Sequence, residues 1–128
     1  MSIDRAKLAE LRDGFERMHA DYRSLAAQAR EAATASGRLR AELFVDPLAE
    51  SASPLARASV EELDRMPVAE LEKAGINVRT VRQLVIAEQR ARALAAKAAR
   101  TAEELKNARA LLDRVEAYAR QFEHEAPK

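Results

Sequence analysis

Apolar side chains recur every three or four residues along the first third of the chain. Counted in heptads, one set of positions reads Leu8, Phe15, Tyr22, Ala29, Ser36 and Leu43, and the set three residues later reads Leu11, Met18, Leu25, Ala32 and Leu39. A 3-4 repeat over five heptads is typical of a helix that packs along a narrow coiled-coil seam. The pattern predicts one long helix over residues 3–44, and Gly37 is the position at which it would kink or end.

The second half of the chain carries the same repeat. Its two sets of positions are Leu84, Ala91, Ala98, Leu105, Leu112 and Ala119, and then Ala87, Leu94, Thr101, Ala108, Val115 and Phe122. No proline or glycine interrupts residues 77–125. A second long helix is therefore predicted over residues 77–124. At 1.5 Å per residue the two helices would be about 63 and 67 Å long, a close match.

Equal lengths and a short connection favour an antiparallel hairpin. If Leu43 lies near Leu84, partner positions sum to about 125, and large residues of one helix mostly face small residues of the other, as even packing requires. The facing pairs are Met18 with Ala108, Leu25 with Thr101, and Ala32 with Leu94. The predicted fold is all-α, a single domain over residues 1–128 formed by a long antiparallel two-helix coiled-coil hairpin.

Residues 45–76 connect the two arms and contain several helix-start signals. Asp46-Pro47 and Ser53-Pro54 each suit the opening of a short helical turn. Ser59 and Glu62 have the spacing of a capping box. Pro67 would start another short helix over residues 68–74, closed by Gly75. These signals predict a small helical cap at the tip of the hairpin.

The end of the cap resembles the helix-hairpin-helix motif of DNA-binding proteins. The similar segment covers residues 71–84, about 14 of 128 residues, with Gly75 and Ile76 at the hairpin, Asn77 in place of the usual second glycine, and Val81 and Leu84 on the packing face. The resemblance implies that backbone amides and nearby polar side chains contact a DNA phosphate. The phosphate-contacting residues would be Gly75, Ile76, Asn77, Arg79, Thr80 and Arg82.

A purely structural interpretation accounts for most of the same residues. Gly75 would supply the left-handed position that ends one helix, Ile76 would pack back on Leu71, and Asn77 would cap the next helix. This interpretation does not explain the positions of Arg79 and Arg82. A cation in the first turns of a helix interacts unfavourably with the helix dipole, at a cost of about 0.3–1 kcal/mol.

Either a bound anion or nearby acidic side chains would offset this unfavourable interaction. The acids of the cap that lie close in sequence are Glu70, Glu72 and Asp64. Both interpretations stay open at this point, with the structural one favoured because the acids would also repel a phosphate.

Charge is balanced overall and uneven along the chain. The net charge is +1, but residues 41–72 hold eight acids and two bases, whereas residues 77–100 hold six bases and one acid. The small net charge gives no general attraction to nucleic acid or membranes. The acidic tip residues Glu42, Asp46 and Glu50 make the hairpin similar to bacterial factors that insert a coiled-coil tip into the secondary channel of RNA polymerase. That similarity implies an alternative role as a regulator of RNA polymerase.

The sequence contains few residues that could carry out catalysis. The chain has no cysteine, no glycine-rich phosphate loop and no paired-histidine zinc motif, and its two histidines, His19 and His124, would lie far apart along the hairpin. We therefore expect no enzyme activity, no metal, no cofactor and no small-molecule substrate. The absence of an apolar run long enough for a signal peptide or a membrane span predicts a cytoplasmic protein. The excess of arginine over lysine, 17 to 5, favours a bacterial or phage source, so a virion is the alternative location.

Apolar residues outside the seam predict a second contact surface, because a two-helix hairpin buries only one seam. The residues of this surface would be Ile86, Ala93, Ala96, Ala110, Leu111 and Tyr118. The sequence thus favours a non-catalytic structural or adaptor subunit that self-associates or docks on a protein partner within a larger bacterial or phage assembly. A nucleic-acid-binding accessory protein is the alternative.

Overall fold

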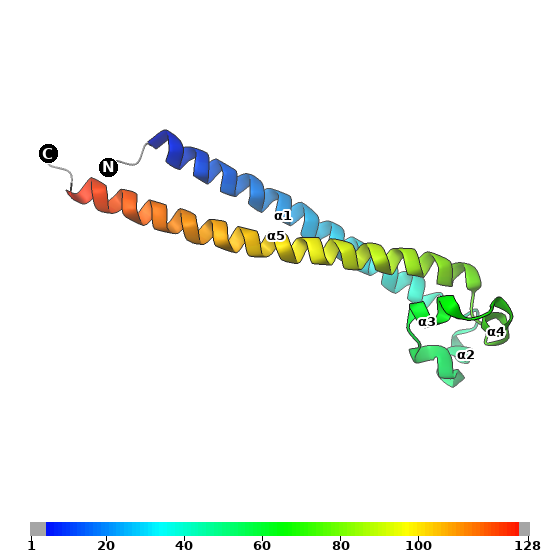
Figure 1. The fold of residues 1–128 in the computed structure, drawn as a ribbon. Helices are drawn as coiled ribbons and strands as arrows, with labels where there is room; N and C mark the ends of the chain where they lie inside the picture. Colours follow the sequence, from blue (N-terminus) through cyan, green and yellow to red (C-terminus); the bar gives the residue numbers. More distant parts are fainter. Residues whose placement is uncertain (1–4, 126–128) are drawn as a thin grey trace. The chain divides into compact units, whose positions relative to one another are not determined.

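The structure, a computed structural model, describes residues 5–125, with side chains to residue 121. All of its elements in this range are helical (Figure 1), apart from an isolated bridge between Phe44 and Ile76. The elements are α1 (Arg5–Ala41), α2 (Pro47–Ala52), the 3-10 helix η1 (Pro54–Arg57), α3 (Val60–Arg65), α4 (Val68–Lys73) and α5 (Val78–Glu125). The all-α prediction is confirmed for the part of the chain described.

The two long helices, α1 and α5, pack together, as a helical hairpin requires. α1 passes through Gly37 without a break and ends at Ala41, three residues before the predicted end. It ends there because the next residues enter the cap: Leu43 and Phe44 are buried, and Phe44 pairs with Ile76. The first residues of the predicted helix, 3 and 4, lie outside the described residues.

Side-chain exposure follows the predicted heptads. On α1 every described seam position except Leu11 is at least half-buried, and on α5 the same holds for every seam position up to Ala119. The side chain of Phe122 lies outside the described range. The 3-4 repeat therefore identified the inward stripe of each helix correctly.

The chain divides into two compact units. The terminal unit comprises residues 1–27 and 96–128, and the cap unit comprises residues 28–95. Among the described side chains of the terminal unit only Leu112 is buried, and α1 contributes no buried residue at all. The terminal unit is thus a pair of helix segments with a half-buried seam.

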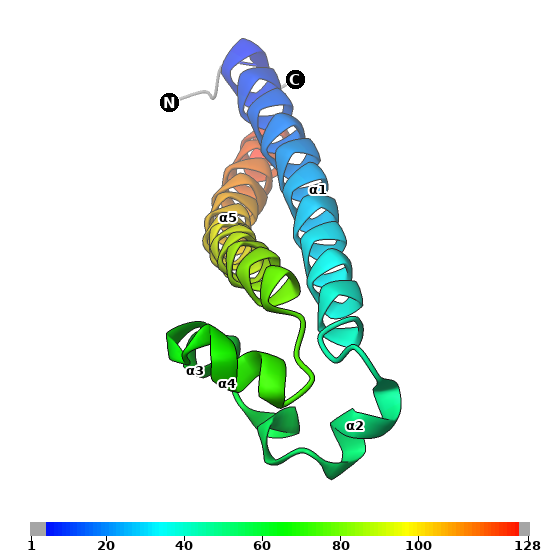
Figure 2. The ribbon, with the colours of Figure 1, turned by 90° about the vertical axis from the view of Figure 1, so that its right-hand side faces the viewer.

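The core belongs to the cap unit. It consists of Leu43, Phe44, Val60, Leu63, Leu71, Ile76, Val81 and Leu84, each at most 5% exposed. Figure 2 shows α2, α3 and α4 following one another between the end of α1 and the start of α5. Apolar residues from the segment after α1, from α3 and α4, and from the start of α5 meet in this one cluster, which holds the connection in place.

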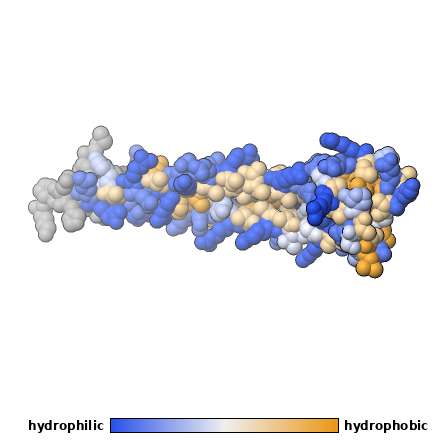
Figure 3. Space-filling view, turned by 90° about the horizontal axis from the view of Figure 1, so that it is seen from below, coloured by the Kyte–Doolittle hydropathy of each residue, from blue (hydrophilic) through white to orange (hydrophobic). Residues whose placement is uncertain are grey.

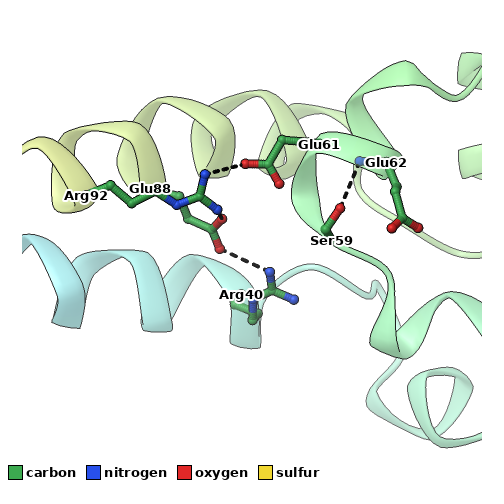
Figure 4. Close-up of polar contacts among 6 residues, drawn as sticks. All are labelled: Arg40, Ser59, Glu61, Glu62, Glu88 and Arg92. Atoms are coloured by element: carbon green, nitrogen blue, oxygen red, sulfur yellow. Dashed lines mark hydrogen bonds and ion pairs between the residues drawn. The ribbon is translucent and has the colours of Figure 1, made fainter.

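Side-chain caps start three of the short helices where the sequence predicted. The Asp46 carboxylate accepts a hydrogen bond from the Leu48 amide at 3.0 Å, and Ser53 Oγ accepts one from the Leu55 amide at 3.2 Å. Ser59 Oγ accepts from the Glu62 amide at 3.2 Å (Figure 4). Each bond satisfies an amide that the first helical turn leaves without a partner.

Candidate functional site

The Gly75 turn ends α4 in a left-handed conformation, with φ of +78° at Gly75. The Gly75 N–H donates to the Glu72 carbonyl oxygen and the Ile76 N–H donates to the Leu71 carbonyl oxygen, both at 3.0 Å. This pair of bonds defines a Schellman motif, and the burial of Leu71 and Ile76 supplies the apolar contact that accompanies it. The predicted structural role of Gly75 is confirmed.

The same turn is tied to the end of α1. The Asn77 N–H donates to the Leu43 carbonyl oxygen and the Val45 N–H donates to the Gly75 carbonyl oxygen, both at 2.9 Å. Asn77 then caps α5, because its Oδ1 accepts from the Thr80 amide at 3.4 Å. The amides of Gly75, Ile76 and Asn77 therefore all donate to carbonyl oxygens of the chain itself. A phosphate could take these donors only by displacing an internal hydrogen bond.

The side chains proposed from the helix-hairpin-helix resemblance differ in exposure to solvent and in their contacts. Ile76 and Thr80 are buried, at 2% and 5% exposure, so neither side chain faces a ligand on the surface. Arg82 Nη1 lies 3.0 Å from Oδ1 of Asp64, one of the three acids that the structural interpretation offered. Arg79 is exposed and takes part in none of the ion pairs found in the described side chains. Of the predicted set, only Arg79 keeps an exposed cation without a carboxylate partner.

A chain of ion pairs links three helices of the cap unit (Figure 4). Arg92 on α5 contacts Glu61 on α3 at 2.7 Å and Glu88 on its own helix at 3.5 Å, and Arg40 on α1 contacts Glu88 at 3.0 Å. The Glu88 side chain is only 16% exposed, so water screens its contact with Arg40 less than it screens a surface pair. One sign of this network is visible in the sequence, where Glu88 is the single acid among residues 77–100.

The network also affects the titration of Glu61. The pKa of its carboxyl group is lowered from the ordinary value of 4.5, first by a hydrogen bond from its own backbone amide and then by the hydrogen bond from Arg92. Both interactions favour the ionised form. The Glu61 side chain is 39% exposed, so its ion pair with Arg92 is a surface contact that joins α3 to α5.

Residues predicted to form a second contact surface are exposed. Ile86, Leu111 and Tyr118 have 68%, 49% and 45% of their surface accessible, and the three alanines of the set, Ala93, Ala96 and Ala110, are exposed as well. Sequence reasoning missed a second apolar area on the cap, where Val45 is 76% and Leu48 80% exposed. Figure 3 shows apolar surface gathered over the cap. In the sequence, the one sign that Val45 and Leu48 are exposed is that neither lies at a heptad position.

A groove of about 400 Å³ lies between α1 and α5 within the cap unit. Its lining residues are Gln28, Glu31, Ala32 and Ala35 from α1 and Gln83, Ile86, Ala87 and Arg90 from α5. Both sets have the spacing i, i+3, i+4, i+7, which defines one face of a helix. The groove is therefore formed by two helix faces that lie next to the seam, and the sequence identified only Ile86 of its residues as available for contact.

The described residues contain no group of three or more acids and histidines that could hold a metal ion. His19 stacks on Phe15 with a centroid separation of 6.1 Å, and the Arg109 guanidinium lies 5.4 Å above the same ring. His19 thus has a packing role in the terminal unit. His124 lies beyond the last described side chain. Within residues 5–125 no helix has the length and apolar character needed to cross a membrane.

Comparison with protein families, with curated proteins and with solved structures gives no match to this chain.

Proposed function

We propose that this protein is a non-catalytic structural or adaptor subunit, an antiparallel coiled-coil hairpin with a helical cap, which self-associates or docks on a protein partner in a larger bacterial or phage assembly. The observation that carries the proposal is the thin core of the terminal unit. One buried side chain, Leu112, stands against a seam of half-buried apolar residues in the described part of that unit.

The energetic reasoning starts from those half-buried residues. Complete burial of a Leu, Phe or Met side chain contributes about 1.5–3 kcal/mol. Phe15, Met18, Leu25 and Leu105 are each only partly buried, so a share of that free energy is still available. A second layer of helices, from another copy or from a partner, would bury the remaining surface.

Contacts within each unit support the antiparallel arrangement. In the terminal unit Arg12 contacts Glu116 at 2.9 Å, while Phe15 lies beneath Arg109. Residue numbers therefore rise along α1 as they fall along α5. In the cap unit Arg40 pairs with Glu88, a sum of 128 that is close to the predicted 125.

The nucleic-acid alternative has less support. It would depend on Arg79, because the amides of the Gly75 turn are engaged within the chain and Arg82 is paired with Asp64. One of the three tip acids of the RNA polymerase alternative has a structural role, because the Asp46 carboxylate caps α2.

The test is the molar mass of the full chain in solution across the micromolar range, by sedimentation equilibrium. We expect a concentration-dependent oligomer, and Leu111→Asp should shift it toward the monomer because Leu111 is 49% exposed outside the seam. Arg79→Ala is the matched control and should leave the mass unchanged. A chain that stays monomeric and binds duplex DNA with a steep salt dependence would overturn the proposal in favour of the nucleic-acid alternative.

A further inference from the structure

We propose that the terminal unit pairs with the terminal unit of a second copy of this chain, through the flank of the seam that carries Leu11, Gly14 and Leu111. The two copies would be related by a two-fold axis parallel to the helices, and four helix segments would form a local bundle. This inference rests on the proposed function and specifies its partner and its surface.

The exposed apolar side chains of the terminal unit gather on one flank of its seam. Among the described side chains of this unit, the large apolar ones with the greatest exposure are Leu11, Leu111 and Tyr118, at 42%, 49% and 45%. Leu111 and Tyr118 lie two turns apart on α5, each three residues after a seam position of the second set. Gly14 has the same place on α1, three residues after Leu11. In an antiparallel pair these positions of the two helices lie on the same side of the seam.

The opposite flank is polar and already occupied. It carries the ion pair of Arg12 with Glu116 at 2.9 Å and the Arg109 guanidinium over the Phe15 ring. Arg12, Arg109 and Glu116 each follow a seam position of the first set by four residues, which places them across the seam from Leu111. A second layer of helices would therefore be added on the flank of Leu111, where apolar surface is exposed.

The register of the terminal unit places Gly14 level with Leu111. The two contacts between the helices on the polar flank join residues whose numbers sum to 128 and 124. Gly14 and Leu111 have a sum of 125, so they lie at about the same height on neighbouring helices. A two-fold axis parallel to the helices preserves this height and places α5 of one copy on α1 of the other. Leu111 of each copy therefore faces Gly14 of the other.

Gly14 leaves space for that leucine side chain. A Cβ added at Gly14 would meet nothing within 4 Å, and the facing Leu111 is a large side chain with half of its surface exposed. A large residue opposite a very small one lets facing helices reach native packing density. In a two-fold interface this contact is made twice. It would also cover Leu11, the one described seam position of α1 that is not at least half-buried.

Charges at the edge of this flank also fit a second copy. Glu10 on α1 and Arg114 on α5 have a sum of 124, and neither takes part in an ion pair among the described side chains. Each lies four residues before a flank position, Glu10 before Gly14 and Arg114 before Tyr118. The same axis brings Glu10 of each copy to Arg114 of the other. A strongly acidic or strongly basic partner would match one of these charges and be repelled by the other.

The contact ends at the next flank positions, Asp21 and Glu104. Their numbers also sum to 125, so the same axis would bring carboxylates of the two copies together. Packed helices cross at about 20°, so the two copies diverge with distance from the Leu111 contact and these acids stay in water. The interface is therefore short and centred on Leu111 and Gly14.

The experiment measures the dissociation constant of the dimer for the full chain by sedimentation equilibrium, with far-ultraviolet circular dichroism as a check on helix content. Gly14→Gln should raise the dissociation constant by about tenfold or more, because the new side chain fills the space that Leu111 of the other copy enters. Helix content should not fall, since glutamine is a better helix former than glycine. Gly37→Gln is the matched control, because a Cβ at Gly37 also meets nothing within 4 Å inside α1, and it should leave the dissociation constant unchanged.

Charge reversal tests the register of the interface. Glu10→Arg and Arg114→Glu should each weaken the dimer by about fivefold, because each places like charges opposite one another at two symmetric contacts. The double variant Glu10→Arg/Arg114→Glu should restore wild-type affinity. Both positions are exposed, so these changes leave the fold of the single chain intact.

The outcomes separate this inference from the proposed function. A wild-type oligomer that is indifferent to Gly14→Gln, or that Gly37→Gln weakens equally, has its interface elsewhere, for example at the exposed Leu48. That result overturns the inference and leaves a self-associating subunit standing, as do single charge reversals that the double variant does not rescue. A wild-type chain that stays monomeric across the micromolar range overturns the inference and also removes self-association from the proposed function.

Discussion

The Arg82 guanidinium lies 3.0 Å from the Asp64 carboxylate, so a cation in the opening turns of α5 is balanced by an acid on α3. Arg82→Ala removes both this exposed ion pair, worth about 0.2–1 kcal/mol, and an unfavourable interaction with the helix dipole of similar size. We expect a change in the free energy of unfolding of less than about 0.5 kcal/mol, measured by urea denaturation.

Arg79→Ala is the matched comparison, because Arg79 has the same dipole cost without a carboxylate partner among the described residues. It should stabilise the protein by about 0.3–1 kcal/mol relative to wild type. If Arg82→Ala proved the more stabilising of the two, the Asp64 contact would contribute nothing in solution.

Gly75→Ala should destabilise the protein by about 1–2 kcal/mol, because only glycine adopts a φ of +78° without strain. The added Cβ would meet Ala49 Cβ at 3.9 Å, an ordinary contact, so the expected loss comes from the backbone alone. Thermal and urea unfolding of the two proteins would measure it.

Gly37→Ala provides the opposite case in the same chain. Gly37 lies inside α1, and a Cβ added there meets nothing within 4 Å. Alanine should therefore stabilise the helix by about 0.5–1 kcal/mol. Equal effects of the two substitutions would mean that the left-handed turn at Gly75 does not persist in solution.

Leu63→Ala should lower the free energy of unfolding by about 2–5 kcal/mol, the range for a leucine deleted from a packed core. Leu63 has no exposed surface and belongs to the core cluster of the cap unit. Leu48→Ala, at a side chain with 80% exposure, should change the same quantity by less than about 0.5 kcal/mol. A large loss for Leu48→Ala in the oligomer but not in the monomer would place that residue in an interface.

The contribution of Glu61 to stability should depend on pH. Because its pKa is lowered in the folded chain, the stabilisation is fully present above the ordinary value of 4.5 and is lost as the pH falls through the lower folded pKa. The difference in unfolding free energy between wild type and Glu61→Gln should be constant from neutral pH down to about pH 5 and should shrink below that.

Arg92→Ala is the control for this pH dependence. It removes the guanidinium that contacts Glu61 at 2.7 Å, leaving the backbone hydrogen bond as the larger remaining cause of the lowered pKa. The pH-dependent difference should therefore become smaller in the Arg92→Ala background and keep its sign. A pH-dependent difference of the same size in the Arg92→Ala background as in wild type would show that the Arg92 contact is absent in solution.

The sequence predicted what depends on local spacing. The heptads located both long helices and their inward faces, and the caps at Asp46, Ser53 and Ser59 located the starts of the short ones, because each is a contact between residues a few positions apart.

The features it could not provide depend on pairs that are distant along the chain. Leu43 bonding to Asn77 ends α1 before the residue that the heptads favour, and Arg40 meets Glu88 only in one register of the two helices. The structural interpretation of Gly75 predicted the left-handed end of α4, but no local pattern could reveal that the Asn77 amide donates to the Leu43 carbonyl oxygen.

The bridge between Phe44 and Ile76 brings together the points at which the chain enters and leaves the cap. Residues paired in this way have Cα atoms about 4.5–5.5 Å apart, a distance that a tight turn can span. The cap is therefore attached at a single position between the two long helices. The spacing of the helix ends at this point is maintained by the bridge and by the core that Val60, Leu63 and Leu71 of the cap share with Val81 and Leu84.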